Sequence, residues 1–61
     1  MKFVIKQTQS NGEYRWVLKA NNGEVIADSN EGYKAKASCT HAIDLIQKGA
    51  ASATIEDETT A

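Results

Sequence analysis

Apolar and polar residues alternate along the first half of the chain, in three runs that end at turn residues. The runs are residues 2–8, 14–20 and 24–28, separated by Asn11-Gly12 and Asn22-Gly23. Asn-Gly is the strongest short hairpin signal because both residues tolerate positive φ. The pattern therefore predicts a three-stranded antiparallel meander over residues 2–28.

Two-residue loops at these turns would fix which residues face each other. Leu18 is then opposite Ile5, Ala20 opposite Phe3, Trp16 opposite Gln7, Val25 opposite Ala20, and Ala27 opposite Leu18. This register gathers the predicted core face, made of Phe3, Ile5, Tyr14, Trp16, Leu18, Ala20, Val25 and Ala27. The opposite, outer face mixes charged residues with Val4, Val17 and Ile26.

The second half of the chain changes to a helical period. Residues 33–48 lack Gly and Pro, and Lys48 and Gly49 are typical of a helix C-terminus. One stripe recurs at spacings of three and four and can pack on the sheet: Ala35, Cys39, Ala42, Ile43, Ile46 and Ala50. Residues 53–57 alternate again and predict a fourth strand, followed by a polar tail over residues 58–61. The fold class expected is α+β, as one domain over residues 1–61.

Length limits what such a domain can bury. A chain of 61 residues buries only about 60% of its unfolded surface, and Cys39, the single cysteine, cannot form an internal disulfide. Oligomerisation is the remaining common source of buried area, so we expect a homo-oligomer. Short apolar runs predict no membrane span, and the first residues do not resemble a secretory signal, so we expect a cytoplasmic location.

Charge gives a second functional hypothesis. The net charge is -1, which does not call for nucleic acid, yet Lys6, Arg15 and Lys19 share the outer face. These cations could bind nucleic acid or another anionic ligand. Tyr14 and Trp16 argue against nucleic acid, because they lie on the core face and cannot stack on bases held by the cations.

No catalytic, cofactor or metal site is predicted. Cys39 and His41 are the only cysteine and histidine, and two residues apart on a helix they point about 200° apart. Cys39 lies on the packing stripe, while His41 lies on the far side near Leu45, and the pattern leaves the roles of His41 and Leu45 open. The acidic residues Glu56, Asp57 and Glu58 are interpreted as solvated charges.

Three stretches carry a resemblance to a known family: WVLKANNGEVIA over residues 16–27, YKAKAS over residues 33–38, and Ala42-Ile43. They resemble the YegP-like family of small bacterial domains of unknown function, over nearly the whole chain. The resemblance implies a β-β-β-α-β unit that occurs as two tandem copies or as one copy paired with a second chain. It implies a homodimer with exchanged C-terminal strands, in which residues 53–57, with Ala53 and Ile55 as contacts, add to the partner's sheet.

The resemblance supplies no activity, ligand or catalytic residue. The leading functional prediction is a non-enzymatic, homodimeric protein-interaction or accessory module. Weak nucleic-acid or anionic-ligand binding through Lys6, Arg15 and Lys19 is the alternative. An enzyme would require titratable groups that converge only at the dimer interface.

Overall fold

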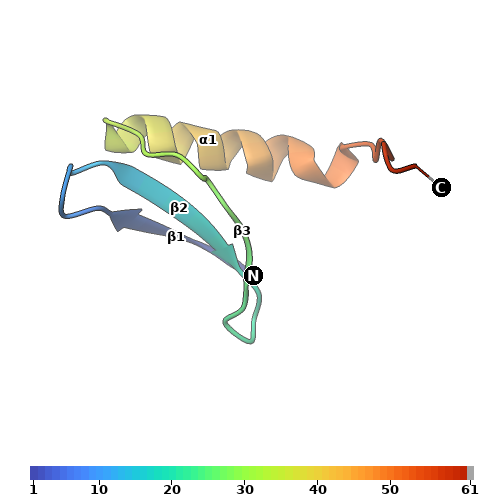
Figure 1. Ribbon diagram of the computed structural model, residues 1–61, viewed down its shortest axis with the longest axis horizontal. Coiled ribbons are helices and arrows are strands. Elements are labelled where there is room, and N and C mark those ends of the chain that lie inside the picture. Colours follow the sequence, from blue (N-terminus) through green and yellow to red (C-terminus); the bar gives the residue numbers. More distant parts are fainter. Residues whose placement is uncertain (61) are drawn as a thin grey trace.

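A three-stranded antiparallel sheet and one α-helix make up the fold, in the order β1-β2-β3-α1 (Figure 1). The computed structural model describes residues 1–60. The strands are β1 (Lys2–Gln7), β2 (Tyr14–Lys19) and β3 (Val25–Asp28), with β2 in the centre. The helix α1 (Lys36–Gly49) lies over one face of the sheet, and a short 3-10 turn, η1 (Ala50–Ser52), follows it. The predicted α+β class and meander are confirmed.

The first hairpin has a longer loop than the Asn-Gly pair predicted. Thr8 donates its amide to the Glu13 carbonyl at 2.8 Å, which closes a loop of residues 9–12 in which Gly12 has a φ of +70°. The Asn11 side chain stabilises this loop by accepting the Glu13 amide proton at 3.0 Å. The predicted pairs Leu18–Ile5, Ala20–Phe3 and Trp16–Gln7 are therefore wrong. The observed pairs are Phe3–Leu18, Ile5–Trp16 and Gln7–Tyr14.

This correction shifts the register of β1 and β2 by two residues, so each side chain of these two strands keeps the face predicted for it. Phe3, Tyr14, Trp16 and Leu18 do pack toward α1. The second hairpin also differs. In its loop Gly23 has a φ of +90°, and the Ala20 amide donates a hydrogen bond to the Glu24 carbonyl. A β-bulge then sets Val25 opposite Lys19, whereas the prediction had set it opposite Ala20. Ala27 lies opposite Leu18 as predicted, whereas Val25 leaves the core face and is 55% exposed.

The helix begins at Lys36 rather than at Tyr33. Tyr33 instead exchanges two backbone hydrogen bonds with Tyr14, each 2.8 Å long, and so extends the line of β3 beside β2. These bonds hold Tyr33 in an extended conformation that a helix could not share. At its other end α1 includes Gly49, whose φ of −118° is not the left-handed value expected of a residue just beyond a helix.

The core is small and lies between β2 and α1. Among the described residues, three apolar side chains are buried: Trp16, Cys39 and Ile43. Phe3 meets Trp16 edge to face, with ring centroids 5.5 Å apart. Trp16 is 8% exposed, and its indole Nε1 has no hydrogen-bond acceptor within residues 1–60.

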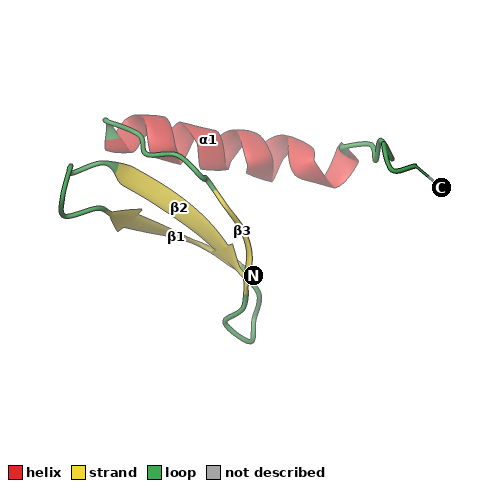
Figure 2. Ribbon diagram, in the orientation of Figure 1, coloured by secondary structure: helices red, strands yellow, loops and turns green. Residues whose placement is uncertain are grey.

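Residues 53–60, which follow η1, form no strand. From the end of α1 the chain runs away from the sheet (Figure 2). The fourth strand is thus not formed by the single chain, and its pairing with a second chain stays a prediction. Over residues 1–60, no helix has both the length and the apolar character needed to cross a membrane.

Gly32 provides a test of this packing. A Cβ added at Gly32 would lie 2.9 Å from the Cβ of Glu13, so Gly32→Ala must displace the first hairpin loop. We expect this overpacking to lower the free energy of unfolding by about 1–3 kcal/mol, measured by urea denaturation at one fixed protein concentration.

Gly49→Ala is the matched control. A Cβ there meets no atom within 4 Å, and its right-handed backbone suits alanine. We expect unchanged stability or a gain of up to about 1 kcal/mol. Equal losses in the two variants would contradict the close approach of Gly32 to Glu13.

Candidate functional site

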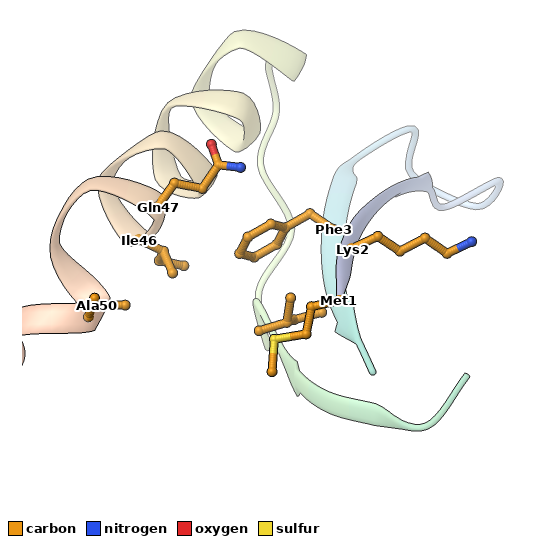
Figure 3. Close-up of a pocket in the computed structure, with 8 residues that line it drawn as sticks. Met1, Lys2, Phe3, Ile46, Gln47 and Ala50 are labelled. Carbon is orange, nitrogen blue, oxygen red and sulfur yellow. The ribbon is translucent and has the colours of Figure 1, made fainter. Parts of the chain in front are cut away.

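An apolar hollow of about 370 Å³ opens where the sheet and the helix diverge, beside the first residues of β1. Its walls come from β1, β2 and the last turn of α1 with η1: Met1, Lys2, Phe3, Leu18, Ile46, Gln47, Ala50 and Ala51. Figure 3 shows the Phe3 ring pointing toward Ile46, while the side chain of Lys2 points away from the helix. The hollow is therefore uncovered apolar surface that continues the core toward the edge of the sheet.

The same edge exposes a further apolar side chain. Ile5 follows Phe3 on the inner face of β1 and remains 37% exposed, although its cross-strand neighbour is the buried Trp16. Because β1 is an outer strand of the sheet, the inner face ends there without a neighbouring strand among residues 1–60. The hollow and Ile5 together form one incompletely covered strip along β1.

The outer face of the sheet gathers positive charge. The register sets Lys6 opposite Arg15 and Lys2 opposite Lys19, with Val4 and Val17 paired between them. Like charges directly opposite each other on neighbouring strands are destabilising. The one salt bridge found within residues 1–60 joins Lys48 to Asp44 on α1, so none of these four cations has an acidic partner there. The structure thus brings Lys6, Arg15 and Lys19 together and adds Lys2.

The C-terminal segment carries the opposite charge and one large apolar side chain. Ile55 is 96% exposed, and Glu56, Asp57 and Glu58 follow it, all exposed. Thr59 donates to Asp57 Oδ1 from its hydroxyl at 2.6 Å and from its amide at 2.9 Å. These bonds hold the pKa of the Asp57 carboxyl below its ordinary value.

The two residues considered for catalysis are separated by the helix. Cys39 is fully buried against Trp16, whereas His41 is exposed. Burial raises the pKa of the Cys39 thiol, which disfavours the reactive thiolate. Leu45 is 58% exposed and does not belong to the core. Within residues 1–60, no three His, Cys, Asp or Glu side chains gather at metal-binding distance.

The sequence pattern did not predict the hollow or the position of Lys2. The hollow depends on how far α1 diverges from the sheet, which no local pattern encodes. Lys2 could have been found from strict alternation with Lys6, but the predicted register left it without a cross-strand neighbour.

Residues 9–57 match the model of a family described as "Domain of unknown function (DUF1508)". The chain belongs to this family. Among curated relatives, a UPF0339 protein of Agrobacterium fabrum is 52% identical over 59 residues, covering 97% of this chain and 92% of that one. The resemblance to a family of small domains of unknown function is confirmed.

Two further matches are a relative with a longer chain and a solved structure. A UPF0339 protein of Acinetobacter baylyi is 54% identical over 46 residues, which cover 75% of this chain but 40% of that relative. The NMR solution structure of a protein from Haloferax volcanii has a TM-score of 0.79 and 30% identity, and the match covers 92% of each chain. That structural match supports the α+β fold.

The buried position of Cys39 predicts slow reaction with thiol reagents. In native buffer we expect a thiol–disulfide dye to label Cys39 at least about a hundredfold more slowly than in denaturant, because an opening costing about 3 kcal/mol exposes about one molecule in a hundred. Absorbance of the released dye measures the rate.

Ser38→Cys supplies an internal reference, since Ser38 is exposed one residue earlier on the same helix. Its added thiol should react rapidly in native buffer. Comparable rapid labelling of Cys39 would contradict its place in the core.

Proposed function

We propose that the chain is a homodimeric protein-interaction or accessory module without catalytic activity, in which residues 53–57 of each copy add to the partner's sheet. The observation that carries the proposal is the 96% exposure of Ile55, on a segment without a strand of its own, while the hollow along β1 stays uncovered. Apolar surface of this kind marks an interaction site.

The size of the core supports the same proposal. Three buried apolar side chains among the described residues are few for a stable domain, and the chain has neither a disulfide nor a metal cluster within residues 1–60. A second copy would supply the missing buried area. The Acinetobacter baylyi relative, of which this chain covers 40%, agrees with a tandem form of the same arrangement.

The absence of catalysis is also part of this proposal. Cys39 and His41 point to different environments, so they offer no nucleophile and base within hydrogen-bonding reach. We also propose a cytoplasmic location, which rests on the buried free thiol of Cys39 and agrees with a reducing compartment.

Light scattering after size exclusion tests the dimer. We expect the full chain to have the mass of two copies, and a chain truncated after Ala51 to be monomeric or unfolded. Ile55→Asp should weaken the dimer more than a hundredfold, because two copies each lose about 1.5–3 kcal/mol of side-chain burial.

Thr54→Asp is the matched control, because it introduces the same side chain one residue away, where alternation turns it to the other side of the strand. This variant should stay dimeric. A full chain that is monomeric at every accessible concentration would overturn the proposed function.

The register also favours a second candidate function, the binding of an anionic ligand by the outer face. Lys6 opposite Arg15, and Lys19 opposite Lys2, make two doubly positive positions without an acidic partner within residues 1–60. Phosphates could neutralise them. Tyr14 and Trp16 lie on the other face, so such binding would use the backbone of a nucleic acid and not its bases.

A salt series tests this candidate. A labelled single-stranded oligonucleotide should bind with log affinity falling by about 0.7 per phosphate contact for each unit of log salt. Lys6→Glu with Arg15→Glu should abolish binding, whereas Lys34→Glu, an exposed loop residue, should change it little. Absent binding at low salt, or a flat salt response, would contradict this function.

A further inference from the structure

The outer face of the sheet has no second layer against it. Figure 2 shows α1 on the inner side, and no other helix of eight or more residues exists within residues 1–60. Resting on the proposed interaction module, we infer that the outer face docks an acidic helix of another protein. That helix presents two carboxylates with one aliphatic side chain midway between them. The site consists of three cross-strand pairs of β1 and β2, namely Lys2–Lys19, Val4–Val17 and Lys6–Arg15.

These three pairs repeat at equal steps along the strands. Each pair is two residues from the next, and Figure 3 shows Lys2 pointing away from the helix, which places the set on the outer face. A strand rises about 3.3 Å per residue, so the valine pair lies about 6.6 Å from each cationic pair and the two cationic pairs lie about 13 Å apart. The site is therefore a half-buried aliphatic centre with a doubly positive position at each end.

An α-helix has nearly the same spacing along one side. Residues at i, i+4 and i+8 share that side, and a rise of about 1.5 Å per residue sets them about 6 Å and about 12 Å apart. Glutamates at i and i+8 would thus reach the two cationic pairs, while a leucine at i+4 would cover Val4 and Val17. A helix aligned with β1 and β2 makes all three contacts at once.

The charges favour an acidic partner. Like charges directly opposite each other destabilise a sheet, and the site contains two such pairs. The salt bridge found within residues 1–60 joins Lys48 to Asp44, so the four cations have no carboxylate there. Carboxylates from a partner would remove the repulsion and could accept paired hydrogen bonds from Arg15. Docking would therefore stabilise an arrangement that is unfavourable in the chain alone.

The composition of the outer face favours a helix over a nucleic acid or a bilayer. Asp28 of β3 lies opposite Val17, and Ile26, two residues earlier on β3, is 51% exposed. A phosphate backbone or an anionic bilayer spread over this face would place negative charge against Asp28 and against the valines. A helix is about 10 Å wide, or about two strand spacings, so it can cover β1 and β2 with Asp28 at its margin.

A second copy of this chain does not supply such a helix. The helix α1 carries one carboxylate, Asp44, which already pairs with Lys48 at 2.9 Å. The acidic residues after α1 are consecutive, at positions 56–58, and form no helix. Even fully extended they span about 7 Å, roughly half the separation of the two cationic pairs. The partner is therefore a different protein.

Two designed peptides test the inference. Each is an alanine-rich helix of about 20 residues, long enough to form in water, with two glutamates and one leucine on one side. The first peptide has glutamate, leucine and glutamate at i, i+4 and i+8. The second has the same composition in the order glutamate, glutamate, leucine. By fluorescence anisotropy we expect the first to bind about tenfold more tightly, because the second places a carboxylate over the valines and leucine over a cationic pair.

Two double variants locate the contact. Lys6→Gln with Arg15→Gln should weaken binding of the first peptide about tenfold, because the ion pairs at one end are lost. These changes also remove a like-charge pair, so they should not impair the fold. Val4→Thr with Val17→Thr keeps the β-branched shape and should weaken binding to a similar extent, about tenfold, because a hydroxyl replaces one methyl group of each valine. Circular dichroism monitors the fold of each variant.

Lys34→Gln with Lys36→Gln is the matched control, because it removes the same charge from exposed residues outside the sheet. It should leave peptide binding unchanged. Equal binding of the two peptides, or binding that ignores the valine changes, would overturn the inference. Tighter binding of a single-stranded oligonucleotide, or of vesicles of phosphatidylserine and phosphatidylcholine, would assign the cations to that ligand and also overturn it.

Light scattering on the same samples tests the proposed dimer separately. A dimer that does not distinguish the two peptides would overturn the docking of a helix and leave the proposed dimer intact. A monomer that prefers the first peptide would overturn the dimer and support the docking site on the outer face.

Discussion

The contact of Trp16 with one face of α1 is the constraint on which the rest of the structure depends. Trp16 stands on the central strand, and Cys39 and Ile43, four residues apart on the helix, close over it. The small thiol of Cys39 leaves room for the indole ring, a pairing of a large with a small side chain that fills space without strain. Phe3 holds the ring from the neighbouring strand, so β1, β2 and α1 are joined at one point.

Because this contact lies toward the beginning of α1, the two layers are held together at that end and diverge at the other (Figure 1). The uncovered strip along β1 is the result. A longer sheet or a bulkier helix stripe would have closed the opening, but Ala50 and Ala51 are small and β1 has no outer neighbour within residues 1–60. The incompleteness therefore follows from the position of the core and not from a local irregularity of the chain.

The alternation of apolar and polar residues and the turn residues were sufficient to predict the three strands and their faces. The spacing of three and four residues was sufficient to predict the existence of the helix. These patterns were insufficient for register, because side-chain bonds at Asn11 lengthen the first loop and the turn at Gly23 introduces a bulge. The predicted start of the helix was wrong for another reason. The residues that follow Tyr33 favour a helix, but the backbone of Tyr33 forms hydrogen bonds with Tyr14, which is distant in the sequence. Such long-range pairing overrides local helix propensity. The cations of the candidate site were recognisable as a set, while their pairing required the correct register.

The exchange proposed for the segment after α1 has an evolutionary consequence. A segment that completes a neighbouring unit makes folding depend on the concentration of free chains, and this dependence disappears when a gene duplication places both units in one polypeptide. The second unit is then always present at the effective concentration that the linker sets. In the proposed dimer, duplication needs no new packing, because it replaces the encounter of two molecules with the folding of a single one.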